Sequence, residues 1–423
     1  MIDIIRIRNN KEEVEKALLK RMDNVNLDEI LKLDKEKREI GTKLDEYRHV
    51  RKVISDSIPK LKKDGKDTNK VINEMKLLGD KIDELNTKYN ELDKKLFELL
   101  AYLPNTPDDD VVGGGKENNK VIYTYKEKPN YNFNLKPHYE ILKELNMIDF
   151  DRGIKIGGEK SWIYTGIGAR LEWALINYFI DTHIKNGFQF MMVPYMLKNE
   201  CGYGAGQFPK FNDEVYKIEN EDLFLLPTAE TALVNLHSNE IMNVDDLPKK
   251  YFAYTQCFRV EAGSSREEER GTIRGHQFNK VEMVAYTKDD NSDEMFDELL
   301  DIAKKLVEGL GLHYQISKLA AGDCSGGMAR TYDLEVWIPS MGIYKEVSSV
   351  SNSRDYQARR SNTKYRDNDG NLHFVNTLNG SGLATSRLIP AIVEQYQNED
   401  GSITVPEVLR PYLGMNVIKG CNK

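Results

Sequence analysis

Two series of apolar residues with alternating steps of three and four run through the first hundred residues. The first series consists of Ile30, Leu33, Ile40, Leu44, Tyr47, Ile54 and Ile58. The second consists of Val71, Met75, Leu78, Ile82, Leu85, Tyr89, Leu92, Leu96 and Leu99. This spacing is the heptad pattern of helices that pack along a seam. The segment between the series contains Pro59 and Gly65, which predict a turn. We therefore expect an antiparallel helical hairpin over residues 28–100, with a length of roughly 45 Å.

Positive charge gathers on the outer half of this predicted hairpin. The basic residues there are Arg48, Arg51, Lys52, Lys60, Lys62, Lys63, Lys66 and Lys70. Such a patch suits a phosphate backbone and favours an arm that binds nucleic acid. The heptads alone are equally consistent with a coiled coil that joins two copies of the chain.

The chain changes character after the second helix. Residues 105–120 contain prolines, an acidic run and three consecutive glycines, which indicate a linker. We therefore expect a helical arm over residues 1–104 and a second domain over residues 121–423. Within that domain, the pattern predicts an amphipathic helix over 171–184, followed by a strand that contains Pro194.

The stretch Tyr251–Thr287 reads as two strands joined by a charged loop. Arg259 and Glu261 end the outgoing strand on one face, because alternate side chains share a face. One face of the return strand carries Arg274, His276, Phe278, Lys280 and Glu282. Guanidinium groups bind phosphate or carboxylate in pairs of hydrogen bonds, and an aromatic ring offers a surface for a base. The hairpin therefore predicts a site for a nucleotide and an amino acid, although a solvated face of charge pairs is the alternative.

Three further stretches carry candidate chemistry. FLLPTAETALVN places Thr and Glu after a short apolar lead-in. TYDLEVWIPSMGIYKEVSSVSN predicts two strands with Glu335 and Glu346 as inward carboxylates, which near a triphosphate usually hold Mg²⁺. For Glu335, a role in supporting its neighbours is an equal alternative. In NTLNGSGLATSRLIPAIVEQYQ, a strand to Asn379 and a glycine-rich turn precede Arg387, which opens a helix. Glycines let the backbone approach a ligand closely.

Composition narrows the picture. The 423 residues allow two or three domains, and a net charge of −8 argues against bulk electrostatic binding of nucleic acid. No apolar run approaches the length of a membrane span, and the first residues lack a secretory pattern, so we expect a cytoplasmic protein. The four cysteines and seven histidines are scattered, which argues against a zinc site.

The motifs together resemble one family. CFRVEAG followed by GTIRGHQFNKVE resembles motif 2 of class II aminoacyl-tRNA synthetases, in the form of the seryl-tRNA synthetases. GSGLATSR resembles motif 3, and Pro194 stands where the motif 1 proline does. The TAE tripeptide resembles the serine-binding TxE signature, and EVSS resembles the family's EISS. The resemblance covers nearly the whole chain. It implies an α+β fold in which an N-terminal antiparallel coiled-coil hairpin precedes a class II catalytic domain, built on an antiparallel β-sheet flanked by helices.

The resemblance also implies an activity. A member of this family is expected to ligate L-serine to serine tRNA with ATP, through a seryl-adenylate, with Mg²⁺ bound to the triphosphate. The selenocysteine tRNA is a further candidate acceptor. The arm is expected to hold the long variable arm of the tRNA, and motif 1 is expected to form a homodimer interface.

The resemblance assigns roles residue by residue. Arg259, Arg274 and Arg387 are implied as catalytic. Serine binding is implied for Thr228, Ala229, Glu230, Glu282, Asn379 and Ser381. ATP binding is implied for Arg259, Val260, Glu261, Gly275, Phe278, Glu346, Val347, Ser348, Ser349 and Arg387. Mg²⁺ binding is implied for Glu346 and Ser349. Binding of tRNA is implied for Arg48, Arg51, Lys52, Lys60, Lys62 and Lys63.

The chain departs from the family pattern in motif 2. Val260 replaces a serine, position 275 is glycine, and Glu267 replaces an arginine, although Arg266 lies one place earlier. Three consecutive glutamates in this loop, residues 267–269, would repel the phosphates of an acceptor stem. Two alternatives therefore stay open. One is a paralogue that passes the seryl group to another acceptor, and the other is a non-catalytic tRNA-binding protein, for which broken motifs would be expected.

Overall fold

The computed structural model describes residues 1–65, 67–261 and 271–420. The chain divides into two compact units. The arm unit consists of Ile2–Leu19 and Asp23–Leu103, and the body unit consists of Met1, Lys20–Met22 and Pro104–Lys423. Each unit is described by itself.

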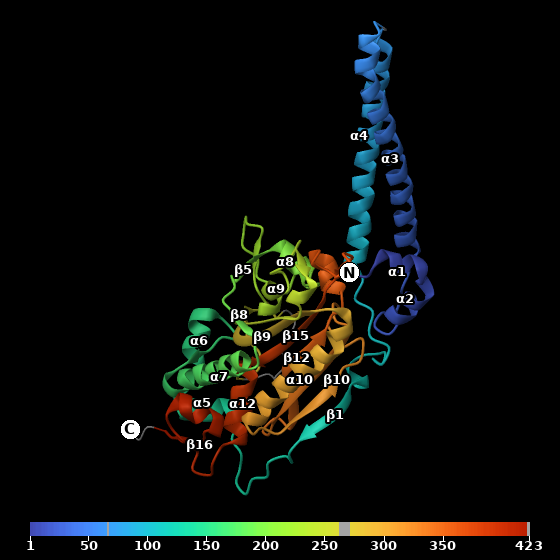
Figure 1. Cartoon of the computed structure of the whole chain (residues 1–423). Helices are drawn as coiled ribbons and strands as arrows, with labels where there is room; N and C mark the ends of the chain where they lie inside the picture. The colour runs from blue at the N-terminus through green and yellow to red at the C-terminus, as the bar shows by residue number, and fades with distance from the viewer. Residues whose placement is uncertain (66, 262–270, 421–423) are drawn as a thin grey trace. The chain divides into compact units, whose positions relative to one another are not determined.

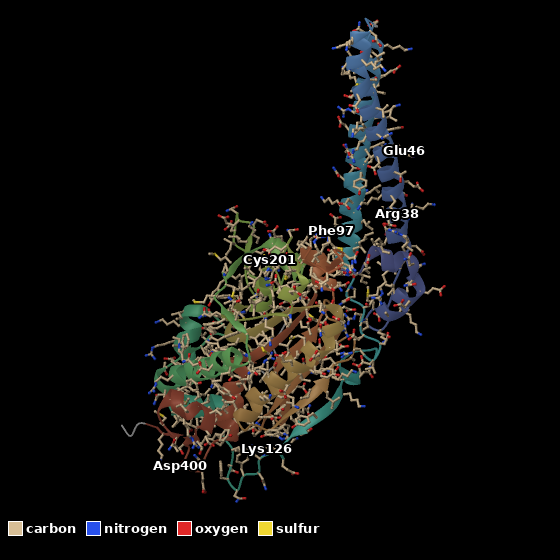
Figure 2. The ribbon with its side chains drawn as sticks, in the orientation of Figure 1. Arg38, Glu46, Phe97, Lys126, Cys201 and Asp400 are labelled. Carbon is tan, nitrogen blue, oxygen red and sulfur yellow. The ribbon has the colours of Figure 1, made fainter. Side chains whose placement is uncertain are left out.

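Two long helices lie side by side in the arm unit (Figure 1). The helices of this unit are α1 Ile4–Asn9, α2 Lys11–Leu18, α3 Asp28–Lys63 and α4 Asn69–Tyr102. Every residue of both predicted apolar series is buried or half-buried, whereas charged side chains such as Arg38 and Glu46 project from α3 (Figure 2). The Lys37 ammonium pairs with Asp93, and Arg48 Nη2 donates to Asn86 Oδ1 at 2.9 Å. The predicted hairpin therefore forms within one chain.

The predicted turn begins too early. Pro59 lies inside α3, which continues to Lys63. Proline removes one backbone donor and usually ends a helix. Here Ile58 before it and Leu61 after it stay half-buried, so seam packing carries the helix one more turn. At about 1.5 Å per residue, the 36 residues of α3 extend roughly 54 Å.

The body unit is built on one eight-stranded sheet, in the order β1-β10-β11-β12-β15-β9-β8-β4. Its strands are β1 Lys120–Tyr125, β4 Gln189–Met191, β8 Lys249–Phe258, β9 Gln277–Thr287, β10 Tyr314–Lys318, β11 Arg330–Ile338, β12 Ile343–Asn352 and β15 Asn376–Ala384. Neighbouring strands are antiparallel except β4 and β8, which are parallel. The predicted fold class is confirmed.

Alternate residues of the central strands fill two cores on opposite faces of the sheet. Phe252 and Met283 belong to a large core with α7 Gly166–Lys185, α10 Ser292–Gly309 and α12 Thr385–Gln395, the helices in front of the sheet in Figure 1. Ala253 and Val284 belong to a smaller core that includes α9 Ala229–Leu233 and α11 Tyr356–Ser361. Because Phe278, Lys280 and Glu282 share the parity of Val284, they lie on the face of the smaller core.

Shorter elements complete the body unit. They are β2 Ile148–Asp149, α5 His138–Glu144, α6 Phe150–Gly157, β3 Ile163–Tyr164, β5 Met196–Lys198, α8 Asn199–Gly204, β6 Leu223–Leu225, β7 Ile241–Asn243, β13 Lys364–Arg366, β14 Leu372–Phe374, β16 Ile403–Thr404, α13 Arg410–Leu413 and β17 Val417–Ile418. No helix in the described ranges has the length and apolar character that crossing a membrane requires.

Three local predictions need correction. The strand expected around Pro194 is two short strands, β4 and β5, on either side of it, since proline cannot donate to a strand ladder. The strands of the motif 2 hairpin stop at Phe258 and resume at Gln277, and Glu261 has a left-handed backbone with φ 52°. The glycine-rich turn expected after Asn379 is instead the end of β15. Gly382 is needed there because a Cβ would lie 2.1 Å from His183 Nε2.

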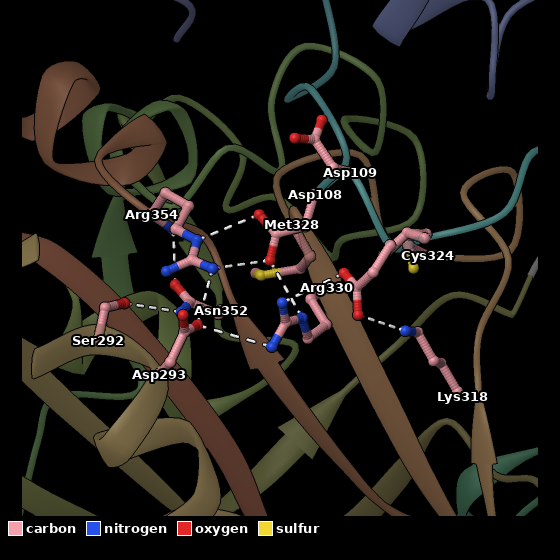
Figure 3. A network of polar contacts seen from close by, with 12 residues as sticks. Asp108, Asp109, Ser292, Asp293, Lys318, Cys324, Met328, Arg330, Asn352 and Arg354 are labelled. Carbon is pink, nitrogen blue, oxygen red and sulfur yellow. Dashed lines mark hydrogen bonds and ion pairs between the residues drawn. The ribbon is translucent and has the colours of Figure 1, made fainter. Parts of the chain in front are cut away.

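The segment after the arm is anchored on the body unit by ion pairs (Figure 3). Asp108 accepts hydrogen bonds from Arg354 Nε at 3.1 Å and Nη2 at 2.8 Å, and pairs with Arg330 at 3.1 Å. Asp293 pairs with the same two arginines, at 2.8 and 3.6 Å. Asn105 Nδ2 donates to Ser353 O at 2.8 Å. The start of the predicted linker is therefore held in place on the body unit.

Candidate active site

A cavity of about 510 Å³ opens on the smaller-core face of the sheet. Ten of the residues implied by the motifs line it: Thr228, Glu230, Arg259, Glu261, Arg274, Glu282, Glu346, Ser349, Asn379 and Ser381. An adjoining cavity of about 50 Å³ shares several of these walls and adds Gly275, Phe278, Val347 and Arg387. Segments far apart in the sequence thus contribute to one continuous site.

Three of the residues implied for serine or ATP binding line neither cavity. Ala229 is fully buried in the smaller core. The Ser348 hydroxyl donates to Ser381 O at 2.6 Å, and so joins β12 to β15. The Val260 backbone N–H donates to Glu214 O at 3.0 Å. These positions support their neighbours through the backbone and through packing.

Two buried carboxylates form the deep end of the large cavity. Thr228 caps α9 by accepting from Glu230 N at 3.2 Å, which fixes Glu230 in the first turn. Glu282 in β9 lies directly opposite Ser381 in β15, whose hydroxyl donates to it at 3.2 Å. Asn379 Nδ2 lies 3.2 Å from a carboxylate oxygen of each glutamate. The cluster offers several hydrogen-bond acceptors and a hydroxyl to a small polar ligand.

Burial shapes the titration of this cluster. Burial, followed by the nearby charge of Glu282, raises the pKa of Glu230 to about 7. Lys280 and a hydrogen bond from Gln357 Nε2 at 2.8 Å act in the opposite direction. A ligand ammonium next to Glu230 would favour the ionised carboxylate, because an opposite charge stabilises it.

Lys280 is a functional candidate that the motif assignment missed. Its ammonium pairs with the Glu282 carboxylate, and only 8% of the lysine side chain and 0% of the glutamate side chain are exposed. The alternation along the strand could have indicated Lys280, since it shares the face of Phe278 and Glu282. Its burial, however, follows from how β8 and β15 assemble with β9 in the sheet.

Arginines line the other end of the cavities. Arg259 donates from Nε to Pro227 O at 3.2 Å, and its guanidinium lies 5.1 Å from the centre of the Phe278 ring. Arg274 pairs with Glu261. Arg387, in the first turn of α12, donates to Glu346 O at 2.8 Å and lies 3.5 Å from its carboxylate. This end can bind a planar ring and several anionic oxygens.

Strands β11 and β12 form an acidic wall. Asp333 lies opposite Ser349, and Glu335 lies opposite Glu346. Glu335 accepts from Ser317 Oγ at 2.6 Å and from Gln315 Nε2 at 2.9 Å, a supporting position. Asp333 lines the cavity instead, and burial followed by the charge of Glu346 raises its pKa well above the usual range. The motif assignment missed Asp333, which alternates with Glu335 in the same run.

The acidic wall fits a hard cation. Asp333 Oδ1 is buried without a hydrogen-bond partner among the residues that the structure describes. Carboxylate and hydroxyl oxygens are the ligands that Mg²⁺ prefers, completed by water and phosphate. Across the described ranges, no group of three or more His, Cys, Asp or Glu side chains is placed to hold a metal ion by itself. The oxygens here suit a cation that arrives with a phosphate ligand.

Comparisons with known proteins agree with this site. The seryl-tRNA synthetase N-terminal domain matches residues 1–107, and the class II core domain of the G, H, P, S and T tRNA synthetases matches residues 213–396. The chain is 55% identical to serine–tRNA ligase 2 of Clostridium acetobutylicum, over 98% of this chain and 99% of that protein. The chain belongs to the seryl-tRNA synthetase family. Serine–tRNA ligase of Clostridium tetani is 42% identical over 99% of this chain and 100% of that protein.

A solved structure of a seryl-tRNA synthetase is also similar over its full length. The crystal structure of seryl-tRNA synthetase from Pyrococcus horikoshii complexed with ATP has a TM-score of 0.92 and 35% identity, and the match covers 100% of both chains. The recognition of a class II aminoacyl-tRNA synthetase from its motifs is thereby confirmed.

Two remaining parts of the prediction concern the basic residues of the arm and the motif 2 loop. Arg48, Arg51, Lys52, Lys60, Lys62, Lys63 and Lys70 are exposed on the arm. Lys66 lies outside the described residues. The altered part of the motif 2 loop, residues 262–270 with Arg266 and Glu267, also lies outside them.

Proposed function

We propose that this protein activates L-serine with ATP to seryl-adenylate and transfers the seryl group to serine tRNA. The observation that carries the proposal is the buried cluster of Glu230, Glu282, Asn379 and Ser381, next to Arg259 in one cavity. Two carboxylates, an amide and a hydroxyl match the ammonium and hydroxyl of serine, and the guanidinium matches its carboxylate.

The amino-acid end of the site selects by hydrogen bonding. Glu230 and Thr228 take the ammonium group, whereas Glu282 and Ser381 take the hydroxyl. Alanine lacks the hydroxyl and would leave these buried groups unpaired, a loss that sites of this kind convert into strong discrimination. Threonine would have to be excluded by the shape of the pocket.

The nucleotide end positions ATP for in-line attack by the serine carboxylate. Phe278 stacks on the adenine, Arg259 binds the α-phosphate, and Arg387 holds the far end of the bent triphosphate. Arg274 adds positive charge near the reacting centre, and Glu261 contacts the adenine. The ATP complex of the Pyrococcus horikoshii relative supports the binding of ATP. Positioning and charge neutralisation are the main protein contributions to such transfers.

Mg²⁺ would be held by Glu346 and Ser349, with Asp333 beside them. When bound, the ion supplies positive charge that offsets the charge of the phosphates. Glu346 and Arg387 lie 3.5 Å apart and balance each other's charge. Binding of nucleotide and ion would replace this pair by one between Glu346 and Mg²⁺ and one between Arg387 and the triphosphate.

The exposed basic residues of the arm hold the tRNA through its phosphates, and the long variable arm of serine tRNA is the expected contact. The sequence match of residues 1–107 to the family's N-terminal domain supports this role. The selenocysteine tRNA is the second acceptor to test.

Two copies of the body unit form a dimer through the motif 1 region. β4 is an edge strand of the sheet. Near it, Met192 is 93% exposed and Trp173 is 53% exposed. Large exposed apolar side chains are typical of a contact with another protein surface.

Exchange of labelled pyrophosphate into ATP, followed by charging of tRNA with the same preparation, tests the proposal. We expect serine to drive exchange and serine tRNA to accept the seryl group. Serine-dependent exchange without charging of any serine or selenocysteine tRNA would favour a paralogue with another acceptor. Absence of exchange would contradict the proposal itself.

A further inference from the structure

A third cavity lies beside the proposed nucleotide site. It has a volume of about 250 Å³ and shares Phe278 and Ser386 with the small cavity that Arg387 lines. Its remaining walls come from α6, the segment between α6 and β3, β3 itself, α7 and β9, and include Gly153, Trp162 and Glu172. Neither the motifs nor the reaction proposed above use this space.

Trp162 fills the space beside Gly275. A Cβ built on Gly275 would lie 2.4 Å from Cζ3 and 2.5 Å from Cη2 of the Trp162 ring, and 3.1 Å from Lys160 O. Distances below 3.0 Å are essentially never seen for real Cβ atoms. Gly275 does not have a positive φ, so its backbone does not require glycine. Glycine is therefore present at position 275 because the indole ring occupies the place of a side chain.

The indole ring cannot easily move back. A Cβ on Gly153 of α6 would lie 2.5 Å from the Trp162 Cα and 2.9 Å from Ser161 O, so the backbone of this segment already lies against α6. On the nucleotide side, Lys160 Nζ donates to Glu261 O at 3.3 Å. The segment is therefore fixed between α6 and both ends of the motif 2 hairpin.

We propose that Trp162 is a specificity-determining residue of the nucleotide site. Gly275 lines the small cavity and Trp162 lines the third one, and the ring lies against Gly275. Trp162 thus closes the nucleotide site on this side, and limits the size of the base that it accepts. This inference rests on the proposed binding of ATP.

The ring and the glycine form a matched pair that a variant cycle can test. Gly275→Ala places a methyl group against Cζ3 and Cη2, and we expect the KM for ATP in serine-dependent exchange to rise roughly ten-fold with little change in kcat. Phenylalanine lacks these outer ring atoms. Trp162→Phe in the Gly275→Ala background should therefore restore most of the affinity for ATP.

A second arm of the experiment probes the cavity directly. Trp162→Ala should open a passage from the nucleotide site into the third cavity. The variant is therefore assayed with ATP analogues that carry an apolar group on N6, C2 or C8 of the base. At least one of them should gain ten-fold or more in kcat/KM relative to ATP. Trp337→Phe is the matched control, because Trp337 lines none of the three cavities.

The outcomes separate this inference from the proposed function. Wild-type protein without serine-dependent exchange would contradict the proposed function. Normal exchange by the wild type, combined with an unchanged KM for ATP in Gly275→Ala, would overturn the role of Trp162. Failure of Trp162→Phe to restore affinity, or equal discrimination against every analogue by Trp162→Ala and the wild type, would overturn it as well.

Discussion

Substitution of Lys280 by methionine tests whether the buried ion pair holds the amino-acid end of the site together. The Glu282 carboxylate is fully buried and would lose its only cationic partner among the described residues, while keeping the 3.2 Å contacts with Ser381 and Asn379. Breaking a buried pair by removing one partner typically costs about 3–5 kcal/mol. Because two hydrogen bonds remain, we expect a loss near the lower end, about 3 kcal/mol of unfolding free energy.

The loss should also depend on pH. The pKa of Glu230 is raised to about 7 by burial and then by the charge of Glu282, and Lys280 counteracts this rise. A carboxyl group whose pKa is higher in the folded state than in the unfolded state destabilises the fold as the pH rises. The loss begins near the pKa of the unfolded state and is complete above the pKa of the folded state. Removal of the Lys280 charge should raise the pKa of Glu230 further, so this loss of stability should continue to a higher pH. The difference in melting temperature between Lys280→Met and the wild type should therefore be larger at pH 8 than at pH 6.

Tryptophan fluorescence is a suitable measurement, because Trp162, Trp173 and Trp337 all belong to the body unit. At roughly 2 °C per kcal/mol for a domain of this size, the melting temperature should fall by about 6 °C. The control is the double variant Lys280→Met with Glu282→Gln, which removes both charges and should recover much of the loss. A melting temperature for Lys280→Met within about 1 °C of the wild type at both pH values would refute this reasoning.

Three further predictions follow from the other parts of the molecule. Deleting residues 33–96 with a short linker should spare serine activation and abolish tRNA charging, which in the full chain should fall steeply as salt rises; charging by the truncated protein would contradict it. Light scattering at micromolar concentration should show a dimer that Met192→Asp weakens, and a monomeric wild type would count against the motif 1 interface. The KM for serine should fall between pH 6 and pH 8 as Glu230 ionises, and Glu230→Gln should remove this dependence; an unchanged pH profile in that variant would exclude Glu230 as the ammonium ligand.

The heptad spacing predicted the arm correctly, because the position of a residue in the heptad determines whether its side chain faces the neighbouring helix. Leu44, Ile82 and Leu96 are all buried in the seam, as their spacing predicts. Pro59 is the exception, since tertiary packing outweighs its local preference for a turn. The face shared by Phe278, Lys280 and Glu282 was equally readable, because alternation along one strand is a local property.

The proposed amino-acid pocket could not be predicted from local patterns. Ser381 lies opposite Glu282 only because β15 pairs with β9 in one register, across about a hundred residues of intervening chain. The buried contacts of Lys280 and the orphaned oxygen of Asp333 likewise depend on which strands meet. The family's motifs named most residues of the site, whereas the partners that tune their charge appeared only in three dimensions.

The most direct test of the central claim is the ratio of kcat/KM for serine and for alanine in ATP–pyrophosphate exchange by the wild-type protein. A buried cluster that hydrogen-bonds the serine hydroxyl through Glu282 and Ser381 should favour serine by about 10⁴-fold. Ser381→Ala should shrink that ratio, mainly through a weaker kcat/KM for serine. If alanine is activated within about ten-fold of serine by the wild type, these residues do not recognise the hydroxyl, and the cluster is not a serine pocket.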